Sequence, residues 1–83
     1  MSKLYDVTIW DGSRLAATAE NIVAEDSQGA ARNGVRAIAS RNRCCMAPAV
    51  VRLYKYLFGD ADRGTLDGVR VFAAEKTRGE QVI

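Results

Sequence analysis

The side chains that most often carry enzyme chemistry are scarce in this sequence. There is no histidine among its 83 residues, so no Ser-His or Cys-His dyad and no histidine-based metal site can form within the chain. Two carboxylate pairs are close in sequence, Glu25 with Asp26 and Asp60 with Asp62. Both lie in polar stretches, whereas a general acid needs burial to tune its acidity. We therefore expect capping or turn roles for these acids, no enzyme activity and no catalytic residue.

Two adjacent cysteines, Cys44 and Cys45, are the remaining groups with redox or metal chemistry. Neighbouring cysteines bridge only through a strained ring, because an ordinary disulfide needs a larger separation of its Cα atoms. Two thiols without a histidine also cannot supply the usual four ligands of zinc within one chain. We expect plain, partly buried thiols and neither a metal nor a cofactor. Redox sensing or a bridge between two chains is the alternative.

The distribution of charge is the strongest functional signal in the sequence. Residues 27–59 contain no acidic residue, whereas the segments on either side of them are net negative. The modest overall charge of +2 therefore conceals a basic middle. An uneven field of this kind steers partners of opposite charge, so we expect a protein that binds another molecule. The bases of the middle segment are Arg32, Arg36, Arg41, Arg43, Arg52 and Lys55.

A β-hairpin is expected to open the chain. Apolar residues alternate with polar ones in Leu4–Trp10 and again in Arg14–Ala24, which is typical of paired, half-buried strands. Asp11-Gly12 between them favours a tight turn of the mirror type, in which both central residues have positive φ. The alternation fails near Asn21, where two apolar residues follow one another, and a β-bulge is expected there.

A helix is expected to begin at Asp26 or Ser27, because either side chain can cap exposed backbone N–H groups. From Ala31 to Ile38 the apolar residues recur at helical spacing. Gly34 falls on this apolar face, where the absence of a side chain permits close approach to the sheet. At about 100° per residue, Arg41 projects elsewhere. Three other arginines form a basic stripe beside the buried face, namely Arg32, Arg36 and Arg43.

The segment 48–58 is compatible with a helix or a strand. Its composition favours a strand, but its spacing places most of the large apolar residues, Tyr54 and Phe58 among them, in one helical arc. Pro48 suits the first helical position and Gly59 the position just past the end. We predict a helix and keep the strand as the alternative. The other arc of the helix would carry Arg52, Lys55 and Tyr56.

The remaining elements complete a small α+β domain. Residues 59–68 are expected to form a loop, Val69–Glu75 a last strand, and residues 76–83 a frayed polar tail. This order predicts one domain, in which the N-terminal hairpin and the C-terminal strand form an antiparallel sheet covered on one face by one or two helices. No segment is long and apolar enough to span a membrane, and no signal peptide is evident. A cytoplasmic protein is therefore expected.

The first half of the chain resembles a layout found in small proteins of phages and mobile elements. The resemblance lies in Tyr5-Asp-Val-Thr-Ile-Trp-Asp-Gly and in Ala24-Glu-Asp-Ser-Gln-Gly-Ala-Ala-Arg-Asn-Gly-Val-Arg-Ala-Ile, a strand pair followed by a helix. Anti-CRISPR inhibitors of class 1 surveillance complexes include chains of this length and layout. The resemblance transfers no functional residue. It implies an inhibitor that binds Cas subunits and blocks access to target DNA.

The sequence thus predicts a non-enzymatic binding protein and, more specifically, a phage-encoded inhibitor acting in the host cytoplasm. It would dock on a host macromolecular complex, such as a CRISPR–Cas surveillance complex, and block its access to nucleic acid. The alternative is a small nucleic-acid-binding domain that uses the basic helix and Tyr56. No membrane partner is expected, and the chain is a monomer or a homodimer. The expected contact residues are Arg32, Arg36, Arg43, Arg52, Lys55 and Tyr56.

Overall fold

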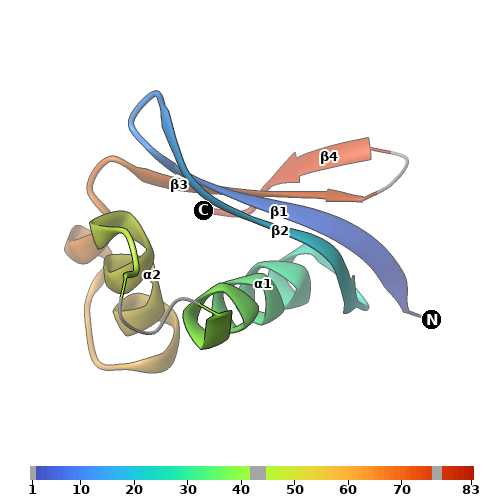
Figure 1. The fold of residues 1–83 in the computed structure, drawn as a ribbon, viewed down its shortest axis with the longest axis horizontal. Coiled ribbons are helices and arrows are strands. Elements are labelled where there is room, and N and C mark those ends of the chain that lie inside the picture. The colour runs from blue at the N-terminus through green and yellow to red at the C-terminus, as the bar shows by residue number, and fades with distance from the viewer. Residues whose placement is uncertain (1, 42–44, 76–77) are drawn as a thin grey trace.

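An antiparallel sheet of four strands with two helices on one of its faces forms the α+β fold (Figure 1). The structure, a computed structural model, describes residues 2–41, 45–75 and 78–83, with the backbone alone for residues 78–81. The sheet order is β2-β1-β3-β4, and no described helix is long and apolar enough to cross a membrane. The elements are β1 (Lys3–Asp11), β2 (Arg14–Ala24), α1 (Ser27–Arg41), α2 (Pro48–Phe58), the 3-10 helix η1 (Arg63–Leu66), β3 (Val69–Glu75) and β4 (Arg78–Gln81).

The expected N-terminal hairpin is confirmed, but its turn differs in detail. The β1–β2 pairing continues up to Asp11 with Arg14, so the central turn residues are Gly12 and Ser13. Gly12 has a φ of +64°. Asp11 does not have a positive φ, because Asn21 is the one non-glycine residue with positive φ in the described part of the chain. The expectation of positive φ at Asp11 is therefore wrong. This turn needs positive φ at its first central residue alone, where the glycine stands.

The expected bulge in β2 is confirmed at Asn21. This residue has a φ of +57°, and the β1–β2 register shifts beside it. Its backbone N–H donates to Oδ1 of Asp6 at 3.1 Å, which stabilises the extra residue in the strand. Because one residue is added there, Ala19 before the bulge and Ala24 after it are both buried.

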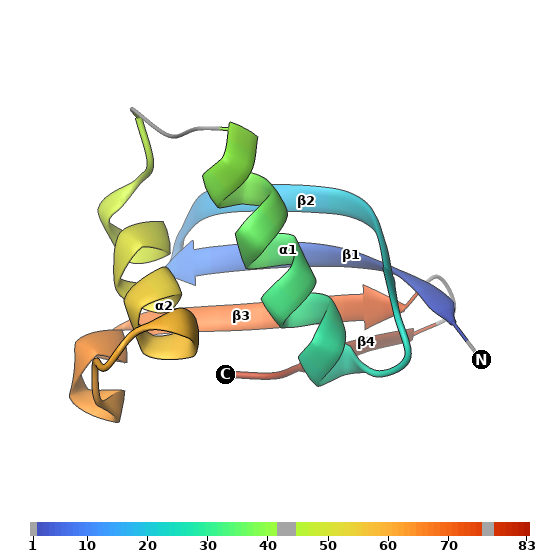
Figure 2. The ribbon, with the colours of Figure 1, turned by 90° about the horizontal axis from the view of Figure 1, so that it is seen from below.

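Both helices pack against the same face of the sheet. In Figure 2, α1 crosses the strands at a slant and α2 lies beside it, near the end of β1. The core forms between the helices and this face, because the strand residues that point toward the helices are apolar. Its largest fully buried side chains are Val7, Ile9, Val35, Ile38, Val50, Leu53 and Val71.

Two features predicted for the first helix are confirmed. The backbone N–H of Gly29 donates to Oδ1 of Asp26 at 2.7 Å, so Asp26 caps the start of α1. Gly34 is buried against β1, where a Cβ atom at this position would lie 2.9 Å from the Cβ of Val7. Ordinary contacts between carbon atoms are about 3.5–4.0 Å long, so this Cβ atom would be too close by about half an ångström or more. Only glycine therefore allows α1 to lie this close to the sheet.

The prediction that residues 48–58 form a helix is confirmed, with Pro48 in its first turn, and the strand alternative is wrong. The rotation of α2 differs from the expected one. Tyr54, expected in the apolar arc, is 38% exposed, whereas Tyr56, expected on the basic face, packs against the core. Periodicity defines an arc of apolar residues, but the positions of α1 and the sheet decide which part of that arc is buried.

Residues 78–81 form a strand and not part of the frayed tail expected for residues 76–83, of which residues 76 and 77 lie outside the described residues. Strand β4 pairs antiparallel with β3. Beyond β4, the N–H of Val82 donates to the carbonyl oxygen of Val71 at 2.9 Å. The N–H of Val71 donates in turn to the carbonyl oxygen of Ile83 at 3.1 Å. Val82 and Ile83 also pack against the core. The tail satisfies backbone groups of β3 that would otherwise form a free sheet edge.

Candidate binding surface

The outer surface of α1 and α2, called the helical layer below, carries positive charge without a carboxylate. The sequence from residue 27 to residue 59 contains no acid, and the two helices make up most of it. Four of the five described bases are exposed, and the fifth, Arg52, is half-buried. Arg43 and Cys44 lie outside the described residues, and Cys45 is free and exposed. The described bases are Arg32, Arg36, Arg41, Arg52 and Lys55.

Two of these bases converge on one aromatic ring. The guanidinium carbons of Arg32 and Arg36 each lie 4.9 Å from the centroid of the Phe58 ring. The Tyr54 ring lies 4.9 Å from the same centroid, tilted by 49°. The face of an aromatic ring attracts cations, so Phe58 holds two like charges near one another. Arg32, Arg36, Tyr54 and Phe58 are called the arginine–aromatic cluster below.

Helical spacing on both elements produces this cluster. Arg32 and Arg36 are one turn apart on α1, and Tyr54 and Phe58 are one turn apart on α2. The helices place these two pairs against one another along their seam. Nη1 of Arg32 also donates to the carbonyl oxygen of Leu57 at 3.4 Å. This carbonyl lies in the last turn of α2, where the partial negative charge of the helix end favours a cation.

A hollow of about 370 Å³ opens beside the cluster, between the two helices. Arg36, Ser40 and Tyr54 contribute a guanidinium, a hydroxyl and a phenol to its wall, and Ala39 and Met46 supply apolar surface. Guanidinium and hydroxyl groups are the donors that hold carboxylate and phosphate oxygens in proteins. No acidic residue lines this hollow. Its chemistry therefore suits an anionic group presented by a partner.

The residues that the sequence predicted for partner contact do not all lie together in the structure. Arg32 and Arg36 lie together, and Lys55 is exposed on α2. Arg52 is instead engaged at the far side of α2, with Nη2 3.5 Å from Oδ2 of Asp11 and Nη1 donating to the carbonyl oxygen of Asp67 at 3.1 Å. It fastens α2 to the hairpin and to the loop after η1.

Tyr54 and Phe58 were expected in the core arc of the helix, and Tyr56 was expected to be the exposed aromatic residue. Phe58 does pack against the core, but it also lies against both arginines, and Tyr54 is exposed. A usable signal was present, because Tyr54 and Phe58 have the same four-residue spacing as Arg32 and Arg36. That signal could be used only once the seam between the helices was known.

Arg52→Gln should lower the stability of the fold while leaving the arginine–aromatic cluster intact. The variant loses a charged hydrogen bond and a partly exposed ion pair, so we expect a loss of about 1 kcal/mol in the free energy of unfolding. Urea unfolding followed by circular dichroism measures this difference. Arg63→Gln, an exposed change of the same kind in η1, is the matched control. Equal unfolding midpoints for the two variants would contradict this role of Arg52.

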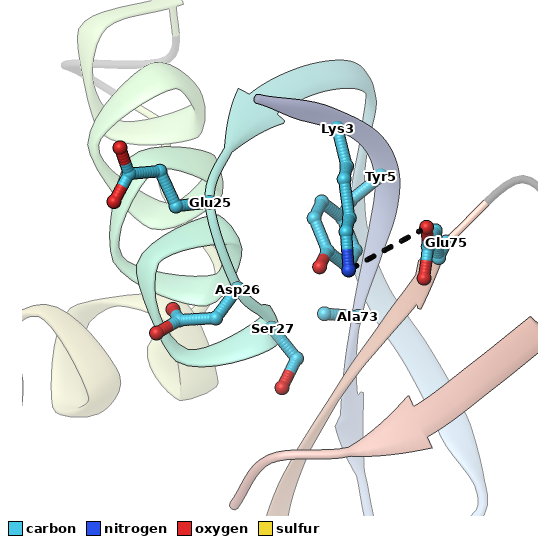
Figure 3. A pocket seen from close by; sticks show the side chains of 7 residues that line it. All are labelled: Lys3, Tyr5, Glu25, Asp26, Ser27, Ala73 and Glu75. Atoms are coloured by element: carbon cyan, nitrogen blue, oxygen red, sulfur yellow. Dashed lines mark ion pairs between the residues drawn. The ribbon is translucent and has the colours of Figure 1, made fainter. Parts of the chain in front are cut away.

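A second hollow, of about 250 Å³, lies between the start of β1, the end of β3 and the β2–α1 connection (Figure 3). Nζ of Lys3 is 4.0 Å from Oε1 of Glu75. Glu25 and Asp26 point away from this pair (Figure 3), and Asp26 caps α1. The carboxylates therefore do not converge. Within the described residues, no charged or polar side chain is buried and no cluster could hold a metal ion.

Comparison with known proteins leaves the helical layer as the main guide to function. No family model matches the chain, and neither the curated proteins nor the solved structures that were searched include a match.

Proposed function

We propose that this chain is a non-enzymatic binding protein that docks its helical layer on an anionic surface of a host macromolecular complex. The observation that carries the proposal is the absence of any acid from residues 27–59, the segment that contains both helices of this layer. A surface with charges of one sign attracts an oppositely charged partner and disfavours association with other cationic surfaces. Binding is favoured over catalysis because the chain has no histidine, Asp26 caps α1, and Glu75 lies within ion-pair distance of Lys3.

The arginine–aromatic cluster supports the same proposal through its preorganisation. Contact with Phe58 restricts the side chains of Arg32 and Arg36 before any partner arrives. Immobilising a long side chain costs about 0.5–1.5 kcal/mol on binding, so side chains that are already restrained lose less free energy. Arginine is also the base best suited to bidentate contact with carboxylates and phosphates. The cluster is therefore the expected centre of the interface.

The more specific proposal is inhibition of a CRISPR–Cas surveillance complex by a phage-encoded protein acting in the host cytoplasm. Its support is the resemblance of the N-terminal half to anti-CRISPR inhibitors, together with an acid-free surface and no evident catalytic group. The protein would dock on an acidic patch at the rim of the nucleic-acid path. Steric exclusion of target DNA would then be the mode of inhibition.

The test is a competition experiment with purified, guide-loaded class 1 surveillance complexes. We expect co-elution with a responsive complex at about 0.1 M salt and dissociation near 1 M salt, since the screening length falls from about 10 Å to about 3 Å over this range. Prior addition of the protein should also reduce binding of target duplex by the complex. If no complex co-elutes and target binding is unchanged, the inhibitor proposal is wrong.

Direct binding of nucleic acid is the second candidate, and one observation favours it. Tyr54 is exposed beside Arg36, and an aromatic ring next to a cation can stack on a base while the cation contacts a phosphate. Titration of single- and double-stranded oligonucleotides at several salt concentrations separates the two candidates. Phosphate binding predicts a log–log slope of about −0.9 per duplex contact and about −0.7 per single-strand contact. No binding at low salt would eliminate this candidate.

A further inference from the structure

The face of the sheet opposite the helices, called the open face below, exposes three large apolar side chains. No described helix covers it (Figure 1). Leu4 and Val23 pair across β1 and β2 with 43% and 57% of their surfaces exposed, and Leu15, 46% exposed, pairs with Trp10. These are three of the four exposed large hydrophobic residues in the described chain, and Tyr54 is the fourth. Apolar side chains exposed on an uncovered sheet face make it a candidate interaction surface.

An aromatic residue, Phe72, forms the centre of the open face. Phe72 on β3 pairs with Thr8 on β1, and Trp10 is its diagonal neighbour. A hollow of about 460 Å³ is lined by both rings together with Thr8, Ser13 and Arg70. The indole N–H of Trp10 donates to Oγ1 of Thr8 at 3.2 Å. Its polar atom is thereby satisfied within the chain, and the ring presents apolar surface outward.

Among the described side chains, the charges of the open face are separated along the strands. Asp6 lies toward one end, paired with Ala74, and Glu20 on β2 falls on the same face by alternation from Thr18. Arg70 lies toward the other end, paired with Trp10, and its guanidinium donates to the carbonyl oxygen of Gly12. Between these ends the paired Thr8 and Thr18 and the ring of Phe72 carry no charge.

We propose that a second copy of this chain covers the open face and forms a homodimer by face-to-face packing of the two sheets. A two-fold axis that lies in the interface and crosses the strands reverses the strand direction between the copies. The acidic end of each face, at Asp6, then covers the basic end of the other, at Arg70. The face is thus complementary to itself in charge, as an isologous interface requires.

This dimer has a defined architecture and a consequence for binding. Packed sheets lie about 10 Å apart, so the two aromatic centres meet in a shared apolar layer. The two helical layers remain outside, on opposite surfaces of the assembly. Each dimer would therefore present two arginine–aromatic clusters facing away from one another. Simultaneous engagement of two anionic sites could strengthen binding without any new contact.

Self-association can be measured directly on the full chain. Trp10 is the single tryptophan of the sequence and lies on the open face, so its emission reports on this surface. Sedimentation should give the dimer mass at high concentration, and dilution should shift the Trp10 emission to the red as the indole meets water. Phe72→Glu should raise the dimer dissociation constant by about tenfold or more. The reason is that dimerisation would then bury one carboxylate from each copy close to the two-fold axis, away from water. Tyr54→Glu, the same kind of change on the helical layer, should leave it unchanged.

Charge exchange tests the orientation of the two copies. Asp6→Arg places a base where the Arg70 end of the other copy would lie, and Arg70→Glu places an acid where the Asp6 end would lie, so like charges meet and each variant alone should be monomeric where the wild type is dimeric. An equimolar mixture should restore the dimer mass, because each end then meets its opposite. Circular dichroism of each variant checks folding, since Asp6 also accepts from the N–H of Asn21. A wild type that is monomeric at every concentration overturns the proposal, as does a dimer indifferent to Phe72→Glu and to both charge variants.

Discussion

Replacing Arg32 and Arg36 together by glutamine should reduce affinity for the proposed anionic partner by about a hundredfold or more at low salt. Each arginine at the centre of an interface contributes about 2 kcal/mol or more when it is truncated, and tenfold in affinity corresponds to about 1.4 kcal/mol. Both side chains are exposed on α1, so the fold should survive the change. The measurement is a binding titration against the partner complex, repeated at two salt concentrations.

The control must remove the same charge from another surface. Arg14→Gln with Arg63→Gln does so, because both side chains are exposed and neither belongs to the helical layer. Arg32→Lys with Arg36→Lys separates charge from geometry, since lysine keeps the charge but lacks the planar fork of arginine. Partial recovery by lysine is expected. Equal affinity of the glutamine variant and the wild type would remove the arginine–aromatic cluster from the interface.

Gly34→Leu should cause a clear loss of stability. The ideal Cβ alone would lie 2.9 Å from Val7, which is fully buried, and a leucine side chain adds three more carbons. Overpacking of this kind costs about 1–3 kcal/mol, occasionally more. The gain from replacing a helical glycine is at most about 1 kcal/mol, so the net effect is destabilising. The midpoint of thermal unfolding should fall by about 4–8 °C for each kcal/mol lost.

The matched control for this variant is Gln28→Leu, which adds a leucine at an exposed position of the same helix. Its midpoint should stay near that of the wild type. Gly34→Ala gives an intermediate case, because it introduces the Cβ without the rest of the side chain. Should Gly34→Leu melt at the wild-type temperature, α1 would not approach β1 as closely as the structure indicates.

The elements that could be predicted are those whose stabilising contacts lie close together along the chain. The hairpin follows from alternation and a glycine at its turn, the bulge from the loss of alternation near Asn21, and the start of α1 from a capping aspartate. For residues 48–58, the residue types favoured a strand and the spacing of the apolar residues favoured a helix, and the spacing gave the correct prediction. The acid-free segment was also visible directly, because a run of residue types needs no tertiary information.

Contacts between distant segments decided the remaining features. Tyr54 rather than Tyr56 is exposed because α2 turns to pack against α1 and the sheet. Arg52 is held at Asp11, more than forty positions away in the chain, and β4 forms because the edge of β3 needs partners. Hydrophobic period depends on residues three or four positions apart, whereas the rotation of a helix and the pairing of a side chain depend on partners that folding brings near. The charge of the helical layer was therefore evident from composition, and its aromatic residues became apparent when the two helices were placed side by side.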